Sequence, residues 1–298
     1  MGASTSTPAT PPECCPPDHV PPRNAADAGA TAAPTGRMVS APTADGSRVC
    51  VYVAGGGGDA PLRGAVVLVH DAFGLTSGRT MQYADELRAL LGDSVAVVAP
   101  DLFGAVGAAM GDNDRDLAWR ACCGGLFGGI YERIRYPWDA VEAKLNDVIA
   151  LLRRDAAEGG LGVPSTAPLA GVGFCWGGWA CFRAAKAPSP FVCATSAHPS
   201  AQVQWLQRSG PTLKEVVDAV SIPLLLCPTK SEPAMLQPDG WIAQSLPAGS
   251  AVVPYPRETH GFANRGDVRV PVIREDVLDV QRRMADFIRD NFAKAGVA

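Results

Sequence analysis

The run GFCWGG, residues 173–178, places a cysteine where nucleophilic chemistry is possible. An apolar run precedes Cys175 and a helix-like run of small residues follows it, so we expect a strand, a sharp turn and a helix. Gly173 and Gly177 stand two residues to either side, and small neighbours allow a nucleophile to occupy a strained turn. A helix start favours thiolate and aims the amide of Trp176 at a developing oxyanion. The alternative is one more buried thiol among nine cysteines.

A histidine follows the last predicted strand. His260 lies in ETHGFANRGD, between the strand candidate 251–256 and a C-terminal helical pattern. Nucleophile, then acid, then base is the chain order of α/β-hydrolase triads, whereas other triad folds use other orders. The acid is expected after the strand candidate 222–227. We hypothesise that Glu232 orients His260, with Asp239 as second candidate; the remaining alternative is a triad without its third member.

A carboxylate ends the strand candidate 65–70, within VVLVHDAFGL. Ligands bind at the carboxyl edge of parallel sheets, so Asp71 is expected to share that edge with Cys175. The amide of Ala72 is then a natural second oxyanion donor. A structural role for the Asp71 carboxylate in its loop is the alternative.

Positioning these residues requires a mostly parallel sheet. From residue 47 onward, short β-rich runs alternate with helical patterns, which indicates an α/β fold with helices on both faces of the sheet. Several runs are apolar without alternation, as strands buried on both faces are. The predicted strands are residues 48–53, 65–70, 94–100, 169–174, 191–196, 222–227 and 251–256. The predicted helices are residues 79–91, 139–154 and 270–292.

The N-terminal composition differs from the rest. Residues 1–44 are rich in Pro, Ala, Thr and Ser, so we predict a partly ordered or disordered tail before a single domain at 45–298. Cys14 and Cys15 in the tail lack a second ligand pair at zinc-site spacing. Residues 103–137 form either a flap over the site or a surface helix with loops.

The overall composition favours a small-molecule partner. A chain of 298 residues with 47% hydrophobic content can bury a sizeable core. Its net charge of −4 gives no electrostatic reason to expect nucleic acid or an anionic membrane surface. We find no run near the roughly 20 apolar residues of a membrane span and no secretory signal pattern, so we expect a cytoplasmic protein.

Four motifs, in the correct order, resemble the dienelactone hydrolase family. GFCWGG resembles its cysteine elbow, and HDAFGL at 70–75 its first carboxylate loop. APDLFG at 99–104 is similar to its strand end, and HGFANRGD at 260–267 to its histidine loop. The tail sequence CCPP is similar to the start of eukaryotic members. The resemblance extends from about residue 14 to residue 292.

The resemblance implies hydrolysis of a small ester or lactone, without a cofactor or metal, through an acyl-thioester on Cys175. It implies that the carboxylate of Asp71 interacts with the thiol and helps to create the thiolate. His260 would orient the thiolate and act as general base toward water. The candidate substrate contacts are Phe73, His198, Phe262 and Arg265.

The sequence departs from the family pattern in two places. Asp71 stands where the family commonly has the longer Glu, and Ser231 stands where the triad aspartate would align. The altered acid loop supports a competing hypothesis, a non-catalytic α/β-hydrolase scaffold that binds small molecules or regulates. The natural substrate and the oligomeric state are left open by the sequence.

Overall fold

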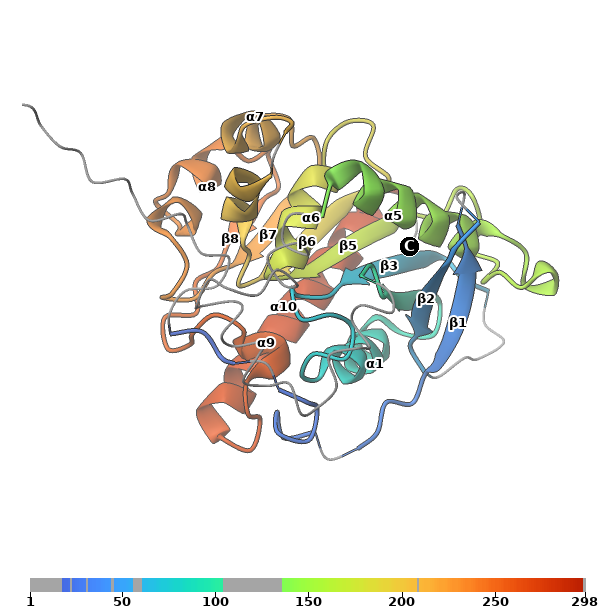
Figure 1. Cartoon of the computed structure of the whole chain (residues 1–298), viewed down its shortest axis with the longest axis horizontal. Helices are drawn as coiled ribbons and strands as arrows, with labels where there is room; N and C mark the ends of the chain where they lie inside the picture. Colours follow the sequence, from blue (N-terminus) through green and yellow to red (C-terminus); the bar gives the residue numbers. More distant parts are fainter. Residues whose placement is uncertain are drawn as a thin grey trace, which may run out of the picture.

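A mixed sheet organises the chain. The computed structural model describes residues 18–21, 23–30, 32–43, 46–55, 61–103, 136–207 and 209–296. In this part the sheet has eight strands in the order β1-β2-β4-β3-β5-β6-β7-β8 (Figure 1). Strands β4, β3 and β5 to β8 are parallel, and β2 is antiparallel to both β4 and β1. The strands are β1 (Arg37–Pro42), β2 (Arg48–Val53), β3 (Gly64–Val69), β4 (Val95–Pro100), β5 (Leu169–Phe174), β6 (Cys193–Ala197), β7 (Leu224–Cys227) and β8 (Ala251–Val252).

Helices cover both faces of the sheet. Helices α1 and α10 pack on one face, and α5 and α6 on the other (Figure 1). The α-helices are α1 (Thr80–Leu91), α5 (Trp138–Arg153), α6 (Trp176–Ala184), α7 (Leu213–Asp218), α8 (Trp241–Ser245), α9 (Phe262–Arg265) and α10 (Pro271–Lys294). Three short 3-10 helices are η1 (Ala156–Glu158), η2 (Ala201–Leu206) and η3 (Ala234–Leu236).

The central strands are buried on both faces, as their unbroken apolar sequences predict. In β3, Val66 and Leu68 belong to the core that contains α1 and α10, whereas Val67 and Val69 belong to the core under α5 and α6. This alternation follows from the two-residue period of a strand. Truncating a fully buried side chain such as Leu68 to alanine is expected to destabilise the fold by about 2–5 kcal/mol.

The predicted mostly parallel sheet with helices on both faces is confirmed. The three predicted helices coincide with α1, α5 and α10 within two residues at either end. The strand predicted at 251–256 is shorter in the structure, because regular pairing covers only Ala251–Val252 and Tyr255 adds an isolated parallel bridge to Thr229. Pro254 and Pro256 have no amide hydrogen to donate to a ladder, which ends the regular pairing early.

Part of the predicted tail is built into the fold. Residues 37–42 form β1, an edge strand that pairs with β2. Residues 18–30 include backbone groups that hydrogen-bond to the segment 260–268. Cys14, Cys15 and nearly all of the candidate flap at 103–137 lie outside the described residues. No helix in the described residues is long and apolar enough to cross a membrane.

Candidate active site

Cys175 occupies a strained turn between β5 and α6. Its backbone has φ 53° and ψ −113°, a conformation that costs a non-glycine residue of order 1–3 kcal/mol. The neighbouring glycines make this turn possible. A Cβ on Gly173 would lie 2.2 Å from the carbonyl oxygen of Gly177, and a Cβ on Gly177 would lie 2.2 Å from that of Val69. The predicted need for small residues on both sides of Cys175 is therefore met by the geometry.

The turn also brings α6 against the end of β3. Because Gly177 has no side chain, its backbone approaches the carbonyls of Val69 and His70, which lead directly to Ala72. Cys175 is the N-cap residue of the nine-residue helix α6, where the helix dipole favours negative charge. Trp176 and Ala72, the predicted oxyanion donors, are both fully buried.

His260 is held by Glu232. Nδ1 of His260 lies 2.6 Å from Oε1 of Glu232, and neither side chain is exposed. The other oxygen of Glu232 accepts a hydrogen bond from the amide of Thr229, which fixes the carboxylate. Asp239 is exposed, and its carbonyl accepts a hydrogen bond from Gln244. The structure thus brings the first predicted acid, and not the second, to the histidine.

The electrostatics of His260 favour its protonated form. Burial lowers the pKa of His260, but the charge and hydrogen bonding of Cys175 together with the Glu232 carboxylate outweigh burial and raise it to about 9. At neutral pH the imidazole of His260 is therefore in its protonated form. Cysteine thiolates in such electropositive settings are the nucleophilic form of the residue.

The carboxylate of Asp71 binds donors from its own loop and from α9. Oδ2 accepts hydrogen bonds from Ser77 and Asn264, each at 2.9 Å, and forms a fully buried ion pair with Arg265. Oδ1 accepts from the amide of Phe73 at 2.9 Å. Arg265 and these donors compete for the carboxylate, and they occupy both oxygens. Asp71 therefore holds its own loop to α9.

Ring contacts connect His198, His260 and Phe262, and Arg265 lies over a further aromatic ring. The ring of His198 lies 4.9 Å from that of His260 and 5.9 Å from that of Phe262. Burial, with the charges of His260 and Arg265, holds the pKa of His198 well below its usual range, so its ring is neutral. Neither ring nitrogen of His198 has a hydrogen-bond partner in the described part of the chain. The guanidinium of Arg265 lies over Phe73, 4.8 Å from the ring centroid.

A match to a known family decides the family of this chain. The sequence profile of the alpha/beta hydrolase family matches residues 66–296. The chain belongs to the alpha/beta hydrolase family. No curated protein matches its sequence.

Solved structures share the fold of this alpha/beta hydrolase. A protein described as a dienelactone hydrolase from Klebsiella pneumoniae is 20% identical, with a TM-score of 0.56 over 87% of this chain and 99% of its own. The dienelactone hydrolase from Anabaena variabilis is 13% identical, with a TM-score of 0.55 over 86% and 98%. An esterase from Pyrococcus furiosus is 14% identical, with a TM-score of 0.52 over 93% and 98%. These likenesses establish a dienelactone hydrolase-like fold.

The N-terminal segment of this alpha/beta hydrolase contacts the histidine loop directly. The amide of Val20 donates to the carbonyl of His260 at 2.7 Å, and the carbonyl of Val20 accepts from Nε of Arg265 at 2.9 Å. The hydroxyl of Ser231 donates to Asp18 at 2.7 Å. Residues 18–20 therefore clamp the loop that carries the candidate base. We name this segment the N-terminal strap.

Ser200 is a site residue that the sequence analysis missed. Its hydroxyl donates to Sγ of Cys175 at 3.4 Å, and its side chain is fully buried. The signal was present in SAHPS, since Ser200 follows β6 at the same sheet edge as His198. Ser77 and Asn264, which bind Asp71, were missed as well; each lies in a loop or short helix whose path the sequence does not reveal.

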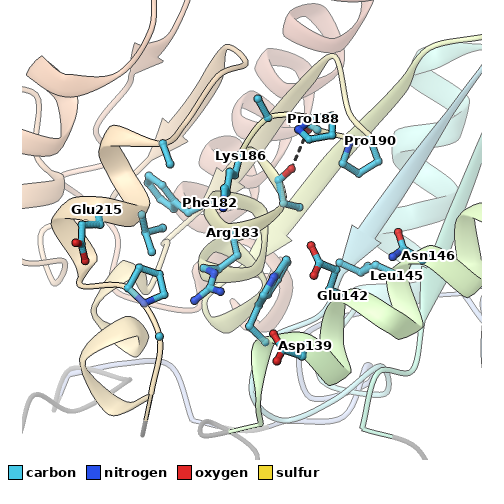
Figure 2. A pocket seen from close by; sticks show the side chains of 18 residues that line it. Asp139, Glu142, Leu145, Asn146, Phe182, Arg183, Lys186, Pro188, Pro190 and Glu215 are labelled. Carbon is cyan, nitrogen blue, oxygen red and sulfur yellow. Dashed lines mark hydrogen bonds between the residues drawn. The ribbon is translucent and has the colours of Figure 1, made fainter.

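A separate cavity of about 1020 Å³ lies at the other end of α6. Figure 2 shows Arg183 in the middle of its lining, with Glu215 on one side and Glu142 on the other. Arg183 donates to Gln204 at 3.1 Å and stacks over Trp138. None of the predicted site residues lines this cavity. Among the described residues, no cluster of three or more His, Cys, Asp or Glu side chains could hold a metal ion.

Proposed function

We propose that this alpha/beta hydrolase cleaves small carboxylic esters or lactones with Cys175 as nucleophile. One observation carries the proposal. The buried side chain of Glu232 binds His260, and the charge and hydrogen bonding of Cys175 raise the pKa of the same histidine. Similar folds in dienelactone hydrolases and esterases support the hydrolase class. Nucleophile, oriented base and orienting acid are the three roles that acyl transfer requires.

Acylation begins from the thiolate and imidazolium pair. The thiolate of Cys175 forms a bond to the carbonyl carbon, and the oxygen gains negative charge between the amides of Ala72 and Trp176. Losing one such donor typically costs about 10²–10³ in rate. His260 then gives its proton to the departing alkoxide, so that the alcohol leaves and an acyl-thioester remains on Cys175.

Deacylation uses the same histidine with the opposite proton direction. Once sulfur is acylated it carries no charge, so a principal cause of the raised pKa of His260 disappears. The neutral imidazole takes a proton from water while the water oxygen attacks the thioester carbon. The carbon–sulfur bond breaks, its electron pair returns to sulfur, and the carboxylic acid product leaves the restored ion pair.

Neighbouring side chains provide the substrate pocket in this proposal. Phe73 and Phe262 supply apolar surface, and the neutral ring of His198 supplies two nitrogens without a hydrogen-bond partner in the described residues. The guanidinium of Arg265 is paired with Asp71, so any contact that it makes with the substrate is made from within this ion pair. The proposed reaction uses no cofactor. A cytoplasmic location and a small-molecule partner remain predictions.

Hydrolysis of p-nitrophenyl acetate tests the proposal. We expect Cys175→Ala to lose enzymatic turnover, while Cys181→Ala retains it. Cys181 is a matched control because it lies in the same helix, and burial raises the pKa of its thiol to about 12, which leaves it unreactive. Turnover by Cys175→Ala at the parent rate would refute the mechanism. Tight binding of a lactone without turnover by the parent would favour the non-catalytic scaffold.

A further inference from the structure

Cys175 has a hydrogen-bond donor that the triad does not include. The hydroxyl of Ser200 lies 3.4 Å from Sγ of Cys175, a normal separation for an oxygen donor and a sulfur acceptor. Both side chains are fully buried, so water does not compete for the contact. A hydrogen bond to a charged acceptor in such a place is roughly twice as strong as one between neutral groups.

The backbone fixes Ser200 in this position. Its amide donates to the carbonyl oxygen of Cys175 at 3.0 Å, so the two residues are joined by main chain as well as side chain. The carbonyl of Ser200 accepts from Val203 at the start of η2. His198, two residues earlier, has φ 40° and turns the chain sharply after β6. The backbone of residues 198–203 therefore holds the Ser200 hydroxyl beside the sulfur of Cys175.

Ser200 offers the sulfur a neutral donor beside groups that carry or exchange charge. Asp71, which the resemblance assigns to thiolate formation, is bound to Arg265, Ser77 and Asn264. Three titratable or charged side chains act on the groups near Cys175. They are His260, the neutral His198, and Arg265, which forms an ion pair with Asp71. His260 supplies the proton exchange, and it must release its proton during each cycle. The hydroxyl of Ser200 can keep its hydrogen and stabilise charge on sulfur while His260 exchanges its proton.

We propose that Ser200 is a catalytic residue that donates a hydrogen bond to the sulfur of Cys175 whenever that sulfur is negatively charged. This occurs twice in each turnover. The resting thiolate is one case, and the second is deacylation, in which the carbon–sulfur bond breaks and its electron pair returns to Sγ. The proton of Ser200 is not transferred in either step, so the proton balance remains between His260, the alcohol and water. The inference rests on the proposed function, in which Cys175 is the nucleophile.

Alkylation of Cys175 by iodoacetamide as a function of pH measures the effect on sulfur. Ser200→Ala is expected to move the midpoint of alkylation upward by about one pH unit, because the thiolate loses a donor. The Ser200→Thr variant keeps the hydroxyl and is expected to remain near the parent midpoint. Ser196→Ala is the matched control: Ser196 is a buried serine at the end of β6 whose hydroxyl donates to Gly173 and not to sulfur. Peptide mass spectrometry assigns the alkylation to Cys175.

Deacylation supplies a second readout. We expect Ser200→Ala to hydrolyse its acyl-enzyme about tenfold more slowly than the parent, with Ser200→Thr close to the parent and Ser196→Ala unchanged. If Ser200→Ala does not fold, Ser200→Val and Ser200→Thr have the same shape and differ only in the hydroxyl. The proposal is overturned if Ser200→Ala matches Ser196→Ala, or Ser200→Val matches Ser200→Thr, in both measurements.

The two proposals fail in different ways. If Cys175→Ala still turns over ester at the parent rate, the proposed function fails and the role of Ser200 fails with it. If Cys175→Ala is inactive but the pH midpoint of alkylation is the same with and without the Ser200 hydroxyl, only the role of Ser200 is wrong. Both results come from the same panel of full-length variants.

Discussion

Nδ1 of His260 lies 2.6 Å from Oε1 of Glu232 in a place that water does not reach. In the proposed mechanism the Nδ1–H of His260 donates to this carboxylate, and Nε2 exchanges a proton with sulfur, alcohol and water. A glutamate therefore takes the position behind the base, although the residue aligned with the family's aspartate is Ser231. Ser231 instead binds the N-terminal strap through Asp18.

Replacing the acid tests this geometry. Glu232→Gln keeps the size of the side chain but removes the charge that fixes the imidazole tautomer, so kcat should fall by about 10³–10⁴. Asp239→Asn is the control, since Asp239 is exposed on the same loop region. Steady-state kinetics on p-nitrophenyl acetate distinguish the two. Unchanged turnover in Glu232→Gln with loss in Asp239→Asn would reverse the assignment.

The raised pKa of His260 predicts how acylation responds to alkaline pH. His260 holds its proton below about pH 9 and loses it above, so an ester with an alkoxide leaving group should be acylated more slowly above that pH. A p-nitrophenyl ester leaves as a stable phenolate and needs no proton, so its acylation should not fall in the same range. Rapid-quench measurement of the first turnover for an ethyl ester and its p-nitrophenyl analogue checks this. Parallel profiles for the two esters would contradict the role of His260 as acid.

The N-terminal strap is expected to support catalysis through its backbone. Val20→Pro removes the amide hydrogen that His260 accepts, and loss of one such bond is worth about fivefold in kcat if it positions the base. Val20→Ala shortens the side chain but keeps the amide, so it should behave like the parent. Comparing kcat and KM for the two variants isolates the hydrogen bond. Equal kcat values would show that the strap does not position His260.

A buried carboxyl near the histidine loop predicts a pH-dependent stability. Burial and the neighbouring Asp276 raise the pKa of Glu258 to about 7. The folded state therefore holds a proton that the unfolded state releases above its ordinary pKa, and stability from this group declines as pH rises from about 4.5 through 7. Glu258→Gln should have a higher Tm than the parent at pH 8, with the difference vanishing near pH 5. Thermal melts at both pH values check the sign, and a constant difference would contradict it.

The residues that the sequence located best lie at the ends of buried strands. Cys175 and Glu232 follow β5 and β7, whose apolar runs are bounded by glycine, proline or polar residues, so their shared edge could be inferred. The turn at Cys175 was predictable because the glycine spacing leaves few alternatives. The same argument placed His260 after the last strand, even though β8 is only two residues long.

Other relationships depend on chain paths that no local pattern encodes. Asp71 and Arg265 are 194 residues apart, and they pair because the fold places α9 beside the loop after β3. Ser200 reaches sulfur because His198 turns the chain at positive φ, an unusual conformation for that residue. Two of the strap's contacts use the backbone of Val20 and one uses the side chain of Asp18, so composition alone predicted a tail.

The central claim is that acyl transfer passes through Cys175. Brief incubation with p-nitrophenyl acetate, acid quench and peptide mass spectrometry measure it most directly. We predict one acetyl group on the peptide that contains Cys175, formed at the rate of the p-nitrophenol burst and lost at the rate of steady-state turnover. Turnover with no acetyl group on Cys175 at any quench time, or with acetylation slower than turnover, would contradict the claim.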